Sequence, residues 1–298
     1  MEASASVLVG LVGAAIQASR SPALHEHEGE AHGLRYIYKL IDLDELGLST
    51  NDLPEILTAA ERVGFDGLNV THPCKHAVIP LLDHSSSEAQ AIGAVNTVVL
   101  KGRRRIGHNT DWYGFAQSFR RGLADMRTDR VVQLGAGGGG AAVAHALLNV
   151  GAGVVHIVDV ERGRAELLAS TLCNRFGTGR AQSCNDPAGA LAAADGLVNT
   201  TPIGMVGHPG TPLSPALLRP DLWVADIVYF PLETPLLREA KARGCRTMGG
   251  GEMAVFQAAG SFRLFTGREP DVERMLRAFA DMTGGVPGEG SGPPWGGS

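Results

Sequence analysis

A six-residue segment, THPCKH at residues 71–76, concentrates side chains that could do chemistry. His72 and His76 would have to converge on one ion to bind a metal, but the proline between them breaks their helical spacing and no carboxylate follows at a matching interval. We therefore expect no metal site. A nucleophilic Cys74 would need a base fixed beside it, and a buried, inert thiol is the commoner case. Lys75 begins a helix after a strand and could face a substrate there, although most surface lysines have no such role.

A glycine-rich turn is the second chemical signal. Gly135, Gly137 and Gly140 form a G-x-G-x-x-G pattern between an apolar strand and an alanine-rich helix. Glycine permits the tight turn and lets the backbone approach a pyrophosphate, which then meets the free amides at the helix start. The pattern alone is weak evidence, but here the strand, the helix and a downstream acid agree. The segment predicts a dinucleotide site.

The downstream acid is Asp159, at the end of the next strand. A carboxylate there can accept hydrogen bonds from both hydroxyls of the adenosine ribose and repels a 2′-phosphate. In the alternative interpretation Arg162 or Arg164 binds such a phosphate, but Arg164 can equally be a surface residue and Glu161 makes the rim acidic. The balance predicts NAD in preference to NADP as the cofactor.

Polar residues also follow the strands of the first half of the chain. Ser19 and Ser21 precede a helix that starts near Pro22, and hydroxyls with free amides at a helix start suit a carboxylate. Ser21 could instead only cap that helix. Asp111, where one half of the chain gives way to the next, is open to the same alternative, since it could be an ordinary N-cap of the helix that follows.

The elements that must position these residues alternate between strand and helix. Strands are predicted at 7–13, 34–42 and 65–71, helices at 21–33, 51–64 and 76–83, and a hairpin turning at Gly102 follows. A second round starts with an amphipathic helix carrying Phe115, Phe119 and Leu123 on one face, and adds strands at 196–199, 222–229 and 245–248. We expect two α/β domains with mostly parallel sheets.

The composition limits the function classes. The chain has 298 residues, 44% of them hydrophobic, which is enough for two cores. A net charge of −5 argues against nucleic-acid binding, and the three arginines at 103–105 fit a solvated hairpin tip.

Two further features bear on location. The apolar N-terminus carries Glu2 and two glycines, so it predicts a buried strand instead of a signal peptide, and no segment approaches the length of a membrane helix. Four scattered cysteines fit a reducing cytoplasm, and the Gly/Pro-rich residues 285–298 predict a disordered tail.

Taken together, the motifs resemble those of the shikimate dehydrogenase family, in the family's order and from about Val7 to Thr283. The matching segments are SRSP at 19–22, NVTHPCK at 69–75, IGAVNTVV at 92–99, GHNTDWYGF at 107–115, LGAGGGG at 134–140, NTTPIGM at 199–205, DIVYFPLETPLL at 226–237 and GGGEMAVFQAAGSFRLFTG at 249–267. The resemblance implies a catalytic, substrate-binding domain from residues 1–110 plus 250–284, and a Rossmann NAD-binding domain from 111–249, with a cleft between them.

The resemblance also implies roles for individual residues. Lys75 and Asp111 would be the catalytic pair. The predicted substrate-binding residues are Ser19, Ser21, Thr71, Asn96, Tyr229 and Gln257. The predicted cofactor-binding residues are Gly135, Ala136, Gly137, Gly138, Gly140, Asp159, Arg164, Thr200, Pro202, Met205 and Gly251.

The chain departs from the commonest family members, which use NADP and carry Asn-Arg-Thr where Asp159, Val160 and Glu161 stand here. It is more similar to the NAD-dependent quinate/shikimate dehydrogenase branch. Some members of that branch have threonine at the position of Ser21, which leaves the preference between the two acids open. The implied activity is reversible oxidation of the C3 hydroxyl of shikimate or quinate. The alternatives are a dehydrogenase for an amino analogue and a non-catalytic metabolite sensor, and the oligomeric state is not predicted.

Overall fold

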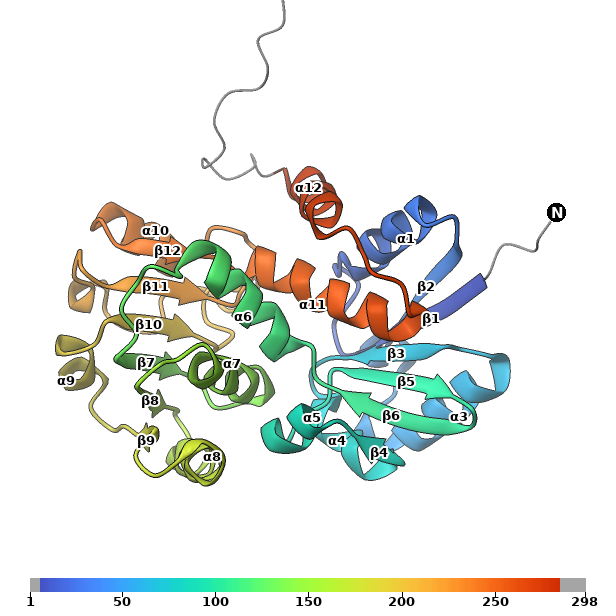
Figure 1. Cartoon of the computed structure of the whole chain (residues 1–298), viewed down its shortest axis with the longest axis horizontal. Coiled ribbons are helices and arrows are strands. Elements are labelled where there is room, and N and C mark those ends of the chain that lie inside the picture. Colours follow the sequence, from blue (N-terminus) through green and yellow to red (C-terminus); the bar gives the residue numbers. More distant parts are fainter. Residues whose placement is uncertain (1–5, 285–298) are drawn as a thin grey trace, which may run out of the picture.

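The computed structural model describes residues 6–284, so the predicted tail at 285–298 lies outside the described residues. Two six-stranded sheets lie side by side, each covered by helices (Figure 1). The predicted two-part α/β architecture with mostly parallel sheets is confirmed. No helix of the described part of the chain is long and apolar enough to cross a bilayer.

The first sheet has the strand order β2-β1-β3-β5-β6-β4. Its strands are β1 (Ser6–Gly13), β2 (Arg35–Asp42), β3 (Gly67–Val70), β4 (His84–Ser85), β5 (Thr97–Lys101) and β6 (Arg104–His108). β1, β2 and β3 are parallel, whereas β5 runs antiparallel to both β3 and β6. Gly102 and Arg103 both have positive φ, as a two-residue hairpin turn requires, so the predicted hairpin is confirmed.

The second sheet is parallel throughout, in the order β12-β11-β10-β7-β8-β9. Its strands are β7 (Arg130–Leu134), β8 (Val154–Val158), β9 (Ala181–Ser183), β10 (Gly196–Asn199), β11 (Trp223–Asp226) and β12 (Arg246–Met248). The chain leaves β7 for β8 on one side and later returns to β10 on the other. This reversal opens a crevice beyond the carboxyl ends of β7 and β10, where doubly wound sheets bind dinucleotides.

Helices cover both sheets and fill the space between them. They are α1 (Ser21–Ala31), α2 (Leu43–Leu46), α3 (Leu53–Val63), α4 (Cys74–Ala77), α5 (Ser87–Ile92), α6 (Asp111–Gly122), α7 (Gly138–Asn149), α8 (Arg162–Phe176), α9 (Pro187–Ala192), α10 (Pro235–Ala242), α11 (Gly250–Thr266) and α12 (Val272–Thr283). Three short 3-10 turns complete the elements, at Thr50–Asp52, Ile79–Leu81 and Pro215–Leu217.

Helices α6 and α11 cross between the two sheets (Figure 1). Their contact is close because Gly114 of α6 has no side chain: a Cβ there would lie 2.6 Å from the carbonyl oxygen of Met253 in α11. The predicted apolar face of α6 is confirmed, since Phe115, Phe119 and Leu123 are all buried. Phe119 packs edge-on against Trp223 of the second sheet, at 5.2 Å between ring centroids.

Some sequence predictions were wrong. The helix expected at 76–83 is a single turn of α4 followed by a 3-10 turn, because Pro80 cannot donate the hydrogen bond that would continue the helix. The helix expected from Asn51 starts only at Leu53, after a 3-10 turn capped by Ser49. The two-residue strand β4 and the six-residue helices α5 and α9 had no periodic pattern long enough to be noticed.

His25 of α1 makes the stability of the first half pH-dependent. It is 1% exposed, lies among aromatic rings and hydrogen-bonds through Nδ1 to Tyr36 at 3.0 Å. Burial lowers the pKa of His25 to about 3, so the folded protein holds a neutral ring where the unfolded chain binds a proton below about pH 6.5. Stability is therefore present above pH 6.5 and is lost as the pH falls toward 3.

We expect His25→Gln to flatten the pH dependence of the free energy of unfolding between about pH 6.5 and pH 4, by about 3 kcal/mol across that range. Denaturant titrations at several pH values measure this slope. His27→Gln, on the exposed side of the same helix, is the matched control. Equal slopes for wild type and His25→Gln would show that His25 does not remain neutral in the folded protein.

Candidate active site

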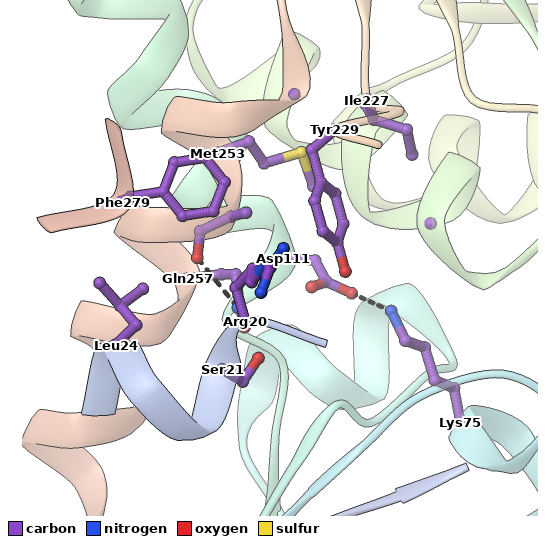
Figure 2. Close-up of a pocket in the computed structure, with 13 residues that line it drawn as sticks. Arg20, Ser21, Leu24, Lys75, Asp111, Ile227, Tyr229, Met253, Gln257 and Phe279 are labelled. Carbon is purple, nitrogen blue, oxygen red and sulfur yellow. Dashed lines mark hydrogen bonds and ion pairs between the residues drawn. The ribbon is translucent and has the colours of Figure 1, made fainter. Parts of the chain in front are cut away.

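A cleft that is partly open to solvent lies where the two sheets and α11 meet. The cavity within it has a volume of about 150 Å³. Figure 2 shows its walls. They come from α1, α4, α6, α7, α11, α12 and the loop after β11, as the lining residues Arg20, Ser21, Leu24, Lys75, Asp111, Gly139, Ile227, Tyr229, Gly250, Met253, Ala254, Gln257 and Phe279 show.

Lys75 and Asp111 form an ion pair in this cleft, with 2.5 Å between Nζ and Oδ2. Lys75 sits in the single turn of α4 after β3, and Asp111 is the first residue of α6. The alternative that Asp111 only caps α6 is wrong. The carboxylate of Asp111 binds Lys75 and Asn96, while Asn109 Oδ1 accepts the amide of residue 111 at 3.0 Å.

Asn96 fixes the orientation of the Asp111 carboxylate. Its Nδ2 donates to Asp111 Oδ1 at 2.8 Å, and its Oδ1 accepts the backbone amide of Thr110 at 2.7 Å. Asn96 is buried, so these bonds form without competition from water. One oxygen of Asp111 is thereby committed to Asn96 and the other is left to face Lys75.

The predicted substrate-binding residues do not all line the cleft. Ser21, Tyr229 and Gln257 do, and Asn96 stands behind the ion pair. Ser19 Oγ accepts the amide of Ser21 at 3.3 Å, so it shapes the turn before α1. No side chain caps α1, which makes the capping alternative for Ser21 wrong.

Thr71 follows β3 and is not part of the lining. Its methyl group occupies the space where a side chain at Gly13 would lie, since a Cβ there would come within 2.3 Å of it. Its carbonyl oxygen accepts the amide of Cys74 at 2.7 Å, and this bond shapes the turn that presents Lys75.

Tyr229 points its hydroxyl toward the ion pair (Figure 2). Its side chain is 40% exposed and lies among the residues that line the cleft. These neighbours partly desolvate the phenol, which raises the pKa of Tyr229, and the negative charge of Asp111 raises it further. The phenol therefore remains a neutral hydrogen-bond donor at ordinary pH.

Sequence reasoning missed several lining residues. Leu24, Met253 and Phe279 form an apolar wall, and Arg20 brings a positive charge between the two predicted serines. Arg20 could have been found from its place between Ser19 and Ser21. Phe279 lies on α12 and gave no signal beyond an apolar helix face.

The other groups of the 71–76 segment are not part of the cleft lining. Cys74 is buried and burial raises its pKa to about 11, so it is a protonated thiol. His76 Nδ1 lies 2.8 Å from the carbonyl oxygen of Gly93. Among residues 6–284 no three His, Cys, Asp or Glu side chains come close enough to hold a metal ion.

The glycine turn after β7 has the shape that a pyrophosphate needs. Gly135 has φ of +98°, and a Cβ at Gly140 would lie 2.5 Å from the carbonyl oxygen of Gly135. Gly137, by contrast, faces open space, with no atom within 4 Å of an added Cβ. It begins α7 without a side-chain cap, so free backbone amides face that space. These residues fit a dinucleotide.

Asp159 lies at the end of β8 beside this turn. Its carboxylate accepts the amide of Ala136 at 2.7 Å and the amide of Glu161 at 2.8 Å. Arg164 is paired with Glu161 at 2.8 Å, and Arg162 with Glu166 at 2.6 Å. Both arginines near Asp159 therefore already have a carboxylate partner on or next to α8.

The remaining predicted cofactor residues are spread around the crevice. Thr200 Oγ1 donates to the carbonyl oxygen of Leu134 at 2.7 Å and so supports the turn from beneath. Pro202 and Met205 are exposed on the loop after β10. Gly251 of α11 faces Phe279 of α12, and Gly138 lies beside the Lys75 side chain.

Proton-transfer groups that face a dinucleotide-binding turn across a cleft are what an alcohol dehydrogenase requires. The class of protein is therefore a nicotinamide-dependent oxidoreductase. The sequence profile of the shikimate dehydrogenase substrate binding domain matches residues 11–98, and that of the shikimate 5′-dehydrogenase C-terminal domain matches residues 250–278. The chain belongs to the shikimate dehydrogenase family.

The relatives in this family differ in cofactor. The chain is 57% identical to a shikimate dehydrogenase (NADP(+)) of Streptomyces avermitilis, over 94% of this chain and 97% of that protein. It is 48% identical to a quinate/shikimate dehydrogenase (NAD(+)) of Corynebacterium efficiens, over 93% and 99%. Its structure is similar to quinate dehydrogenase from Corynebacterium glutamicum in complex with NAD, with a TM-score of 0.87, 45% identity and coverage of 93% and 99%.

The glycine turn offers a matched pair of substitutions. Gly140→Ala should lower the free energy of unfolding by about 2 kcal/mol, because its Cβ would collide with backbone atoms. Gly137→Ala should leave stability within about 0.5 kcal/mol, because its Cβ meets nothing and its φ of −75° suits any residue.

Gly137→Ala should nevertheless weaken cofactor binding about 10-fold, because its methyl group enters the space a pyrophosphate would occupy. Denaturant unfolding without cofactor and titration calorimetry with NAD separate the two effects. Unchanged cofactor affinity in Gly137→Ala would place the pyrophosphate elsewhere.

Proposed function

We propose that the protein catalyses the reversible oxidation of the C3 hydroxyl of shikimate or quinate to the ketone, with Lys75 and Asp111 as the catalytic pair and NAD as the preferred cofactor. The observation that carries this proposal is the ion pair of Lys75 and Asp111, fixed by Asn96 at the mouth of a glycine-turn crevice. It is supported by the membership of the shikimate dehydrogenase family and by relatives named for both acids.

The proton is moved by this chain's own residues. Nicotinamide, when bound, exchanges a hydride with the ring carbon of the substrate. In the oxidising direction the neutral amine of Lys75 accepts the hydroxyl proton, and in the reducing direction its ammonium donates that proton back. Asp111, held by Asn96, orients Lys75 and can accept a hydrogen bond from the reacting hydroxyl.

The other cleft residues bind the ring. Ser21 and the Tyr229 phenol are donors suited to the carboxylate, and Gln257 is suited to a ring hydroxyl. In this proposal three residues do not contact the substrate. Ser19 shapes the turn that carries Ser21, Thr71 shapes the turn that carries Lys75, and Asn96 holds Asp111. This division of roles requires residues 1–110 and 250–284 to form the substrate-binding domain and residues 111–249 the cofactor domain.

The preference for NAD rests on the charges beside β8. Asp159 offers a carboxylate to ribose hydroxyls and repels a 2′-phosphate, and Arg164 is neutralised by Glu161. A relative of 57% identity is named for NADP(+), so the cofactor has to be decided by experiment.

The first experiment follows NADH and NADPH absorbance with purified protein, offering shikimate and quinate with each cofactor. Turnover of either acid with NAD would support the whole proposal. Turnover only with NADP would remove the role given to Asp159 and leave the reaction intact. No turnover of either acid would favour an amino analogue or a sensor.

Lys75→Ala should lower kcat by about 100-fold or more while KM for the acid changes by less than about 3-fold, because the proton then has no positioned acceptor. Steady-state kinetics with the better acid measure both constants. Lys101→Ala, at the exposed end of β5, is the control. A large rise in KM with kcat intact would make Lys75 a binding residue only.

Asp159→Asn should lower the ratio of kcat/KM for NAD to that for NADP by about 30-fold, because the charge that repels a 2′-phosphate is gone. The amide also replaces one acceptor of two backbone N–H groups, so both cofactors can lose affinity and the ratio is the informative quantity. Glu55→Gln removes an exposed charge of α3, away from this turn, and serves as control. An unchanged ratio would contradict the role of Asp159.

A further inference from the structure

The charges of the cleft do not balance. Its ionised lining residues are Lys75, Asp111 and Arg20. Lys75 and Asp111 neutralise each other, and Asp111 gives its second oxygen to Asn96. The guanidinium of Arg20 makes no ion pair or hydrogen bond with any residue between 6 and 284. The cleft therefore carries one uncompensated positive charge.

Arg20 lies in a hydrogen-bonded turn at the start of α1 and lines the cleft. Arg20 is the N-cap residue of α1, with φ of −89° and ψ of −4°, and its carbonyl oxygen accepts the amide of Leu24 at 3.1 Å. The Ser19 Oγ bond to the amide of Ser21 tightens the same turn. Arg20 is among the residues that line the cleft (Figure 2). Arg20 is thus an exposed residue that also lines the cleft.

We propose that Arg20 binds the carboxylate of the substrate and so makes the enzyme specific for an alicyclic hydroxy acid over its uncharged analogues. This inference rests on the proposed function. A guanidinium presents paired N–H groups that match a carboxylate, and a charge-assisted bond of this kind is stronger than the neutral bonds a serine or tyrosine supplies.

The position of Arg20 also sets which way the ring lies. Lys75 and Asp111 come from α4 and α6, whereas Arg20 and Ser21 come from the start of α1. A carboxylate held by Arg20 and Ser21 directs the rest of the ring toward the ion pair, with Leu24, Met253 and Phe279 alongside. Arg20 thus contributes to binding and to orientation, while Lys75 contributes to the chemical step.

The test compares three variants on two forms of the substrate. Arg20→Gln removes the charge, Arg20→Lys keeps it without the fork of N–H groups, and Arg35→Gln removes an exposed arginine of β2 as the matched control. Each is assayed with the free acid and with its uncharged methyl ester. Thermal-shift titrations of the free acid, without cofactor, give binding independently of turnover.

For the free acid, Arg20→Gln should raise KM about 10-fold with kcat within about 2-fold, since the exposure of the pair limits its strength. Arg20→Lys should raise KM about 3-fold, and Arg35→Gln should match wild type. For the ester, Arg20→Gln should equal wild type, because no charge remains to be bound. The thermal shift given by the acid should fall most in Arg20→Gln, less in Arg20→Lys and not at all in Arg35→Gln.

Three results would overturn the inference. Equal KM values for Arg20→Gln and Arg35→Gln would make Arg20 a surface charge. Equal losses on acid and ester would place the guanidinium on ring hydroxyls. If wild type turns over neither acid, the proposed function fails. The thermal-shift titrations then test Arg20 independently of turnover. If the free acid raises the melting temperature of wild type and of Arg20→Gln equally, Arg20 does not bind the carboxylate.

Discussion

The ion pair between Lys75 and Asp111 is the interaction on which the geometry of the cleft depends. Lys75 lies in the turn after β3 and Asp111 at the start of α6. The pair can therefore form only when these two elements are correctly placed relative to each other. The pair is partly buried, and neither charge could be removed without leaving the other poorly compensated. Asn96 and Asn109 keep Asp111 available to Lys75 by satisfying its other oxygen and its backbone amide. The position of the Asp111 carboxylate is thereby fixed on the side away from Lys75 as well.

That pair is held in place by close backbone packing. α6 carries Asp111 and α11 carries Gln257, and the two helices approach until a Cβ at Gly114 would touch the backbone of α11. Close approach of this kind leaves little freedom for one helix to slide past the other. It also explains why the C-terminal helices matter to a site whose ion pair comes from α4 and α6. α11 closes the cleft and α12 adds Phe279 to its wall.

The sequence predicted the parts of this structure that have local or motif signals. Long periodic segments gave the two sheets and the amphipathic face of α6, and the glycine pattern gave the turn after β7. The family resemblance predicted the pairing of Lys75 with Asp111. The two residues lie 36 positions apart, so their spacing in the sequence could not have predicted it. The helix predicted at 76–83 is absent because Pro80 lacks the backbone N–H that would continue it, although the apolar pattern suggested a helix. Arg20 was missed although it lies between the two predicted serines. Phe279 was missed because its place in the cleft wall depends on how the distant helix α12 packs, which no local pattern encodes.

A hydrogen-bond network links Ser21, at the start of α1, to Asp111 of the ion pair. Ser21 hydrogen-bonds to the Tyr38 phenol. Burial raises the pKa of this phenol, and the bond with Ser21 partly opposes that rise. The Tyr38 hydroxyl in turn donates to Asn69 at 2.9 Å. Asn69 donates to Thr97, Thr97 to Asn96, and Asn96 to Asp111. Apart from Ser21 these residues are buried, so an unmade bond in the series would leave a polar group without water to replace its partner. The two ends of the site are therefore held at a fixed separation by the interior of the first sheet.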